Sequence, residues 1–187
     1  MQQPSFVFDV PYPPRLSRLL LLVKWLLVIP HVAVLWLLGL LASVVTIVAW
    51  FAILITGRYP LGMWTFVVGV VQWSTRVSVY ATYYLRDDYP PFGEGPYPME
   101  FRVRYPERLS RLLIFVKWLL IIPHAFALMV LGTVAGFTVL VSWFATLITG
   151  HYPEGLFRFH VGVLRWATRV SLYMALLTDD YPPFSLD

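Results

Sequence analysis

Lysine and histidine side chains recur at matched spacing in this chain. Lys24 precedes His31 by seven positions. Lys117 precedes His124 in the same way. Two imidazoles presented by a repeat could ligate one haem or chlorophyll. The alternative is that each histidine caps backbone carbonyls freed by the proline before it. We favour the second interpretation and expect no cofactor, because no third ligand or porphyrin-shaping motif accompanies the histidines.

The other candidates for chemistry are cations in apolar stretches that contain almost no acid. They are Lys24, Arg76, Lys117, Arg158, Arg165 and Arg169. No acidic residue lies between Asp9 and Asp87, and Glu154 is the only one between Glu107 and Asp179. Unpaired cations in a membrane must reach lipid phosphates or acids of another chain.

Three partners for these cations stay open. Phosphates of anionic lipids are the favoured partner, followed by a partner subunit's carboxylates. The third is the pair of acidic clusters at helix ends, 87–88 and 179–180. Because the apolar segments lack carboxylates, a proton or sodium carrier is disfavoured.

The sequence contains none of the catalytic motifs that we looked for. The chain has no cysteine, which excludes disulfides, thiolate metal sites and cysteine nucleophiles. It has no nucleophile elbow, no His-Glu-x-x-His and no glycine-rich phosphate loop. The doubled aspartates before Tyr-Pro-Pro read as helix ends and proline turns rather than as a metal site. We therefore expect no enzyme and no metal.

The chain consists of two copies of one module, residues 1–92 and 93–187. Arg15-Leu16-Ser17-Arg18 returns 93 residues later as Arg108-Leu109-Ser110-Arg111. The same offset holds until one residue is lost between Ala81 and the closing Asp-Tyr-Pro-Pro-Phe. A period of this length is too long for a solenoid repeat.

Composition places the modules in a membrane. The chain is 59% hydrophobic and 13% charged, outside the range of soluble globular proteins. The apolar runs Val32–Ile55 and Ala125–Ile148 each reach about 36 Å as a helix, enough to cross a bilayer. A formal net charge of +4 near helix ends suits anionic head groups better than nucleic acid.

The predicted fold is an all-α integral membrane protein with short extramembrane strands. Alternating residues predict strands near Phe6–Val10 and Met99–Tyr105, which could pair across the repeat axis. Arg15–Ile29 is a half-helix bent at the following proline, and it leads into the spanning helix. An amphipathic helix follows, Leu61–Leu85 or Leu156–Thr178.

Charge distribution predicts the topology. Arginines concentrate before the first helix and in the linker, which places both termini in the cytoplasm of a bacterium, with a multi-pass chain in the inner membrane. No cleaved signal peptide is expected. We favour four spans arranged as parallel repeats. The rival topology lays Leu61–Leu85 and Leu156–Thr178 in the interface, because Arg165 and Arg169 are costly at a lipid-facing midplane.

Small residues predict helix packing. Gly132 and Gly136 form a GxxxG pattern, and Gly39 with Ser43 is its counterpart. Such faces let two helix backbones approach closely, within the chain or between protomers.

Several motifs carry a family resemblance. They are the run 105–111, the Lys-Trp-Leu-Leu-x-Ile-Pro-His block, Thr-Gly-x-Tyr-Pro, the run 165–170 and Asp-Asp-Tyr-Pro-Pro-Phe. Together they resemble a bacterial integral-membrane family known as domain of unknown function four-three-eight-nine. The resemblance implies a small multi-helix membrane protein, often in tandem copies, with no assigned activity. Gln72 stands where the second copy has Arg165, which argues against fully equal halves.

Three functions follow as hypotheses. The leading one is a non-enzymatic accessory or scaffold subunit that packs with partner helices or a second protomer and holds anionic lipid or partner acids through its cations. The second is a lipid or small-solute transport protein whose path lies between the modules. The third is a haem- or chlorophyll-binding subunit using His31 and His124.

Overall fold

The computed structural model describes residues 5–187. The first module contains β1 (Phe6–Asp9), α1 (Arg18–Leu27), α2 (Ile29–Thr56), α3 (Leu61–Val77) and the π-helix η1 (Ser78–Thr82). The second module contains β2 (Glu100–Val103), α4 (Leu113–Leu120), α5 (Ile122–Thr149) and α6 (Glu154–Met174). The mostly helical fold and the tandem repeat agree with the sequence prediction.

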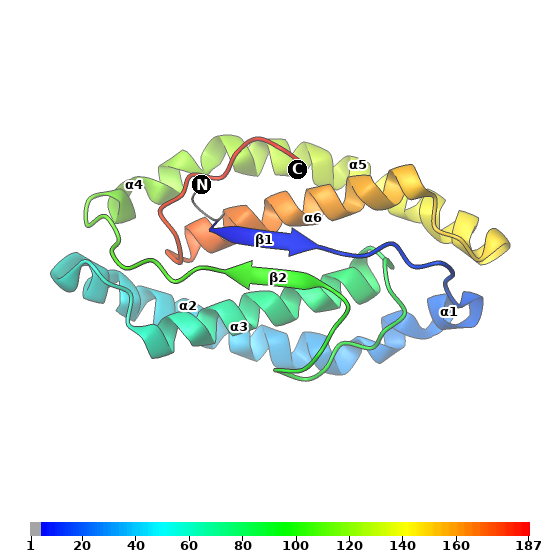
Figure 1. The fold of residues 1–187 in the computed structure, drawn as a ribbon, viewed down its shortest axis with the longest axis horizontal. Coiled ribbons are helices and arrows are strands. Elements are labelled where there is room, and N and C mark those ends of the chain that lie inside the picture. Colours follow the sequence, from blue (N-terminus) through cyan, green and yellow to red (C-terminus); the bar gives the residue numbers. More distant parts are fainter. Residues whose placement is uncertain (1–4) are drawn as a thin grey trace.

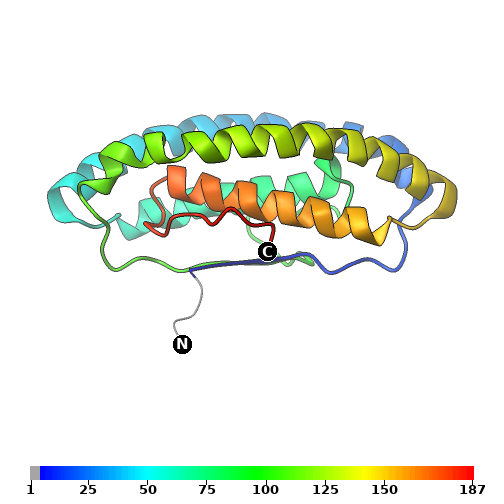
Figure 2. The same ribbon diagram turned by 90° about the horizontal axis from the view of Figure 1, so that it is seen from above.

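The elements form three layers (Figures 1 and 2). The outer layer holds α2 and α5 with their short leading helices α1 and α4. The middle layer holds α3 and α6, and the third holds the two strands (Figure 2). The long helices run in opposite directions, and the sheet lies near the middle of the long axis with its strands along that axis (Figure 1).

The strands join the two modules. β1 and β2 pair antiparallel, with Phe6 opposite Val103 and Phe8 opposite Phe101. The predicted pairing of these strands across the repeat axis is therefore confirmed. Because equivalent strands pair antiparallel, the modules are related by an approximate twofold axis that is perpendicular to the sheet (Figure 1).

Each module also receives the start of the other. The amide of Leu16 donates to the carbonyl of Gly150 at 2.9 Å, and the amide of Leu109 donates to Gly57 at 2.9 Å. Both glycines end long helices in the left-handed conformation, with φ of +70° at Gly57 and +77° at Gly150. Each of these helix ends thus serves as a docking point for the opposite module.

The predicted bend before each long helix is also confirmed. α1 ends at Leu27, and α2 begins at Ile29 with Pro30 in its first turn, where a missing amide hydrogen costs nothing. Ser17 caps α1, since its hydroxyl accepts from the amide of Leu20 at 3.3 Å.

The modules differ by one residue, and the structure shows where it is accommodated. η1 follows α3, with the amide of Tyr83 bonded to the carbonyl of Ser78. α6 ends without such an element. A π-turn accommodates one extra residue without disturbing the helix around it. The closing segments, defined as residues 87–92 and 179–184, consequently reach equivalent places.

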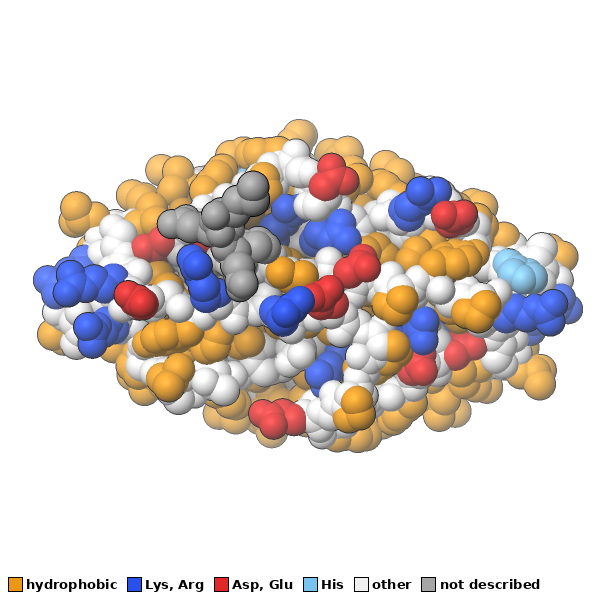
Figure 3. Space-filling view, in the orientation of Figure 1, with side chains coloured by type: hydrophobic (Ala, Val, Ile, Leu, Met, Phe, Trp, Pro, Cys, Tyr) orange, Lys and Arg blue, Asp and Glu red, His pale blue; other side chains and the backbone are white. Residues whose placement is uncertain are grey.

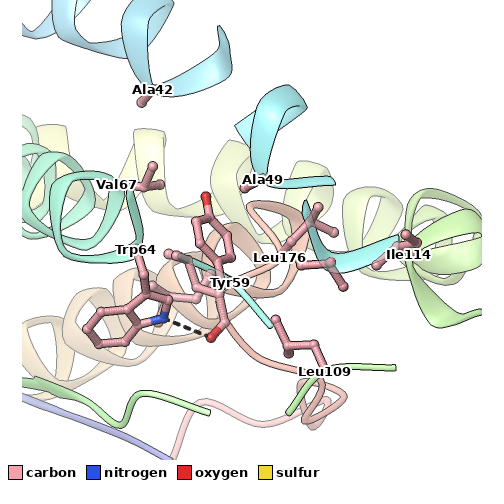
Figure 4. Close-up of a cluster of buried hydrophobic side chains, with 11 residues drawn as sticks. Ala42, Ala49, Tyr59, Trp64, Val67, Leu109, Ile114 and Leu176 are labelled. Carbon is pink, nitrogen blue, oxygen red and sulfur yellow. Dashed lines mark hydrogen bonds between the residues drawn. The ribbon is translucent and has the colours of Figure 1, made fainter. Parts of the chain in front are cut away.

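One core cluster draws on both modules (Figure 4). Tyr59 and Trp64 of the first module pack beside Leu109 and Leu176 of the second. The indole of Trp64 donates to the carbonyl of Leu177 at 3.2 Å. The two copies thus share buried surface.

The outer layer is apolar and mostly uncovered. Neither α2 nor α5 contains a charged residue. Side chains such as Trp36 (69% exposed), Phe137 (69%) and Ile55 (73%) project from it. The segments Ile29–Thr56 and Leu113–Thr149 are long and apolar enough to cross a membrane. Exposure of this extent differs from the buried core helix of a soluble protein.

Candidate functional site

The residues singled out by their spacing meet in one cluster per module. In the first module the ammonium of Lys24 lies 2.9 Å from a carboxylate oxygen of Asp87 and donates to the carbonyl of Arg86 at 2.6 Å. The other oxygen of Asp87 accepts from the amide of Ser17 at 2.5 Å. The ammonium also lies over the ring of Tyr80, 4.9 Å from its centroid. The closing segment is thereby bound to α1.

The second module repeats this arrangement. Lys117 lies 2.9 Å from Asp179 and donates to the carbonyl of Thr178 at 2.6 Å. Asp179 accepts from the amide of Ser110 at 2.6 Å, and the ring of Tyr173 lies under the ammonium. Identical geometry at both places indicates that the ion pair is built into the module.

Each histidine lies at the centre of an aromatic cage. The indole of Trp73 donates to Nδ1 of His31 at 3.1 Å, and the ring of Phe92 stacks on the imidazole at 4.0 Å. The hydroxyl of Tyr89 donates to the carbonyl of Leu27 at 3.2 Å. The tyrosine, rather than the histidine, therefore binds the carbonyl freed at the helix break.

The second cage matches the first. Trp166 donates to Nδ1 of His124 at 3.1 Å, and Phe184 stacks on the ring at 3.9 Å. The Tyr181 hydroxyl donates to the carbonyl of Leu120 at 3.3 Å. We call each set of lysine, histidine and tryptophan with its closing segment the module's clasp.

The cage geometry argues against the cofactor hypothesis. His31 and His124 are both 0% exposed, so a porphyrin has no access to either ring. Because Nδ1 accepts a hydrogen bond, the proton of a neutral ring sits on Nε2, which then has no lone pair for a metal. Each histidine instead packs against the phenylalanine of its closing segment and so holds that segment beside the helix break.

The structure also corrects the expectation that the lysines lack an acid of their own. Lys24 is 0% exposed, Lys117 is 1% exposed, and each pairs with an aspartate of its own closing segment. This was the least favoured of the three options. Burial lowers the pKa of Lys24, and the hydrogen bond and charge of Asp87 oppose that shift.

Arg76 and Arg169 bind chain carbonyls. The guanidinium of Arg76 donates to Gly93 at 3.0 Å, and that of Arg169 donates to Ser185. Each holds the residue that follows a closing segment. Burial lowers the pKa of Arg76 from its usual value, and the nearby Glu94 opposes the shift.

Arg165 and Arg158 differ from this pair. Arg165 donates to the carbonyls of Phe8 at 2.9 Å and Leu186 at 2.8 Å, and it lies 3.3 Å from Asp9. It therefore fastens both β1 and the C-terminal residues to α6. Arg158 is largely exposed and pairs with Glu154 at 3.2 Å.

A comparison with known protein families gives a match whose limits coincide with those of the clasps. The family described as Domain of unknown function (DUF4389) matches residues 18–93 and 111–185. The chain belongs to this family. Each matched DUF4389 segment contains one complete clasp and stops directly after its closing segment, while both strands lie outside. No curated protein and no solved structure matches the chain.

The small residues do not bring two helix backbones of this chain together. A Cβ atom at Gly39, Gly132 or Gly136 would meet nothing within 4 Å among the described residues. The hydroxyl of Ser43 donates to the carbonyl of Gly39 within its own helix. The within-chain contact was therefore a wrong prediction, and a contact with a second protomer or a partner helix stays a prediction.

Sequence reasoning used the arginines before the first helix and in the linker only for topology, yet four of them, together with Arg58, are exposed near the ends of the long helices. We call them the end arginines: Arg15, Arg18, Arg58, Arg108 and Arg111. None lies within ion-pair distance of a carboxylate in residues 5–187. A pocket at one end is lined by Arg58, Arg108 and Arg111. Blue side chains mark both ends of the molecule (Figure 3).

A cleft lies between the modules on the side of the long helices. Its volume is about 850 Å³, and its lining combines apolar side chains with small or hydroxyl residues. Gly39 and Ser43 of α2, Thr75 of α3 and Thr168 of α6 are among them. The volume falls within the range of about 300–1,000 Å³ typical of small-molecule sites.

Proposed function

We propose that this protein is a non-enzymatic membrane scaffold that binds anionic lipid. Lipid tails cover its outer layer, and lipid phosphates bind its end arginines. The clasps hold each helix break rigid, so that the scaffold keeps its shape.

The exposed outer layer carries this proposal. Large apolar side chains project along the whole of α2 and α5, far beyond the single exposed residues that are normal on soluble proteins. Exposure of apolar surface to water costs about 25 cal/mol of free energy for each Å². Contact with the hydrocarbon of a bilayer removes this cost.

The end arginines supply the preference for anionic lipid. They are exposed and lack carboxylate partners among the described residues, and Arg18 and Arg111 lie beside the glycines that end the long helices. Near an anionic membrane each such cation contributes about 1 kcal/mol. Guanidinium binds phosphate through two parallel hydrogen bonds.

Flotation with liposomes tests the proposal. The purified protein should float with vesicles, and the double variant Arg18→Gln with Arg111→Gln should bind anionic vesicles about 30-fold more weakly. The matched control is Arg102→Gln with Arg158→Gln, which removes equal charge from exposed arginines that pair with Glu100 and Glu154. Equal losses of vesicle affinity in both double variants would show that net charge alone, and not the position of the end arginines, determines binding.

A second candidate, lipid handling, is favoured by one observation. The cleft between the modules is large, mostly apolar and on the lipid-facing side in our proposal. Native mass spectrometry of protein purified in mild detergent should then show one retained lipid. Replacement of Thr168 by Trp should displace it, and a lipid-free wild-type protein would rule this candidate out.

A further inference from the structure

The geometry points to a flat arrangement in which α2 and α5 lie within one leaflet of a bilayer and do not cross it. The strands and all end arginines then face the same aqueous side. This inference rests on the proposed membrane association and specifies which surface meets the lipid.

The layers of the fold have the dimensions for this arrangement. A helix with its side chains is about 10–12 Å thick, and one leaflet of hydrocarbon is about 15 Å deep. The outer layer contains only the long helices with α1 and α4 (Figure 2). It therefore fits within one leaflet along its full length, as interfacial amphipathic helices do.

The face opposite the outer layer has the charged side chains expected of a surface in contact with water. Charged side chains gather over the strands and beside them (Figure 3). Arg102, Glu100 and Asp9 are exposed there, with side chains 75%, 44% and 62% accessible. The charged face and the outer layer are the two broad faces of the molecule, so the membrane normal follows its shortest axis (Figures 1 and 2).

An upright arrangement puts the wrong groups in hydrocarbon. With α2 and α5 parallel to the normal, the sheet would sit at the bilayer centre, because it lies near the middle of the long axis (Figure 1). In residues 5–187, β1 and β2 pair only with each other, so neither outer edge of the sheet has a neighbouring strand. Open sheet edges and exposed charges do not occur in lipid-facing hydrocarbon.

The twofold axis adds an independent argument. In the flat arrangement this axis coincides with the membrane normal, so both modules meet the lipid at the same depth. In the upright arrangement the modules would be inverted repeats, with end arginines on both sides of the membrane. Parallel repeats with upright long helices, as the sequence suggested, are incompatible with long helices that run in opposite directions (Figure 1).

Lipid fits the outer layer better than a second copy of the chain does. The layer bows outward between its two ends (Figure 2). Two such convex faces touch only near their centres and leave the remainder exposed. Exposed tryptophans at Trp25 (61%), Trp36 (69%) and Trp118 (60%) are typical of a membrane interface.

Cysteine labelling in sealed membrane vesicles of known sidedness tests the arrangement, and the chain contains no native cysteine. Gly62→Cys and Gly155→Cys form a matched pair at equivalent positions in the first turns of α3 and α6, at opposite ends of the molecule. A Cβ atom at either glycine meets no atom of residues 5–187 within 4 Å. Arg102→Cys reports on the sheet face, and Val44→Cys on the outer layer.

The flat arrangement predicts that a membrane-impermeant maleimide treats Gly62→Cys, Gly155→Cys and Arg102→Cys alike. All three react before detergent is added, or all three react only afterwards, while Val44→Cys is protected in both orientations of the vesicle. Labelling of one glycine variant and protection of the other overturns the inference. Recovery of the protein in the soluble fraction overturns the membrane proposal itself, and a soluble dimer identifies a second copy as the cover.

Discussion

The two modules share their clasps and differ in what attaches to the helix behind them. Lysine, aspartate, histidine and tryptophan keep the same contacts in both copies, with distances equal within 0.1 Å for the ion pair and the indole bond. The amphipathic helices differ: α6 holds β1 through Arg165, whereas α3 has Gln72 at the equivalent position. The contacts that close the helix break are therefore duplicated, whereas the contact between the amphipathic helix and the sheet has diverged.

Removing the lysines tests the equality of the clasps most strongly. Lys24→Met and Lys117→Met each leave an aspartate without its cation, and breaking a buried pair costs about 3–5 kcal/mol. Since each aspartate is 26% exposed, we expect about 2–3 kcal/mol from either variant. Unfolding in mild detergent should show equal losses, and a neutral result at one site would refute the equivalence.

The tyrosines that follow the long helices should separate the modules. The hydroxyl of Tyr152 donates to the carbonyl of Tyr83 at 3.0 Å and lies 2.8 Å from Nδ1 of His160. The hydroxyl of Tyr59 is buried without a partner among the described residues, and Val67 stands where the second module has His160. Tyr152→Phe should cost about 1–3 kcal/mol, and Tyr59→Phe should be neutral or stabilising. Equal losses in the same unfolding assay would contradict this difference.

Arg165 should prove to be the link between β1 and α6. Arg165→Gln recreates the residue of the first module and removes hydrogen bonds from a charged group, at about 1.5–3 kcal/mol when fully buried. The side chain is 22% exposed, so we expect about 1–2 kcal/mol. Hydrogen exchange at Val7 and Phe8 should rise. Unchanged protection there would show that the sheet holds without this arginine.

The smallest effect is expected from two equivalent glycines. A Cβ atom at Gly162 would lie 2.8 Å from the Cβ of Leu186, whereas at Gly69 it meets no atom of the described part of the chain within 4 Å. Gly69→Ala should stabilise α3 by about 1 kcal/mol through helix propensity. Gly162→Ala should lose that gain and release the C-terminal residues to limited proteolysis. Similar gains in both variants would argue against a close contact in solution.

Sequence patterns identified the modules, the strands and the helix breaks, because each has a local signature. The pairing of Lys24 with Asp87 has no local signature of this kind. Asp87 is far along the chain, and only the return of a lysine and an aspartate in both copies pointed to their meeting. The roles of Tyr89 and Phe92 were missed because proline-rich segments have no periodicity that predicts direction.

Orientation could not be predicted for a different reason. The hydropathy of α2 is the same whether the helix stands upright or lies flat in a leaflet. The distinction comes from the antiparallel pairing of β1 with β2, which fixes the twofold axis, and from the charged face that this axis crosses. No sequence pattern singles out His160, because the first module has Val67 at the equivalent position, although His160 is fully buried beside Tyr152.

The depth of α2 in a bilayer is the most direct measurement of the central claim. Spin labels at Leu37→Cys, Val44→Cys and Ile55→Cys occupy exposed positions along the helix. The flat arrangement predicts similar depths for all three, within one leaflet. A spread of about 27 Å between the first and last label, as an upright helix requires, would contradict it.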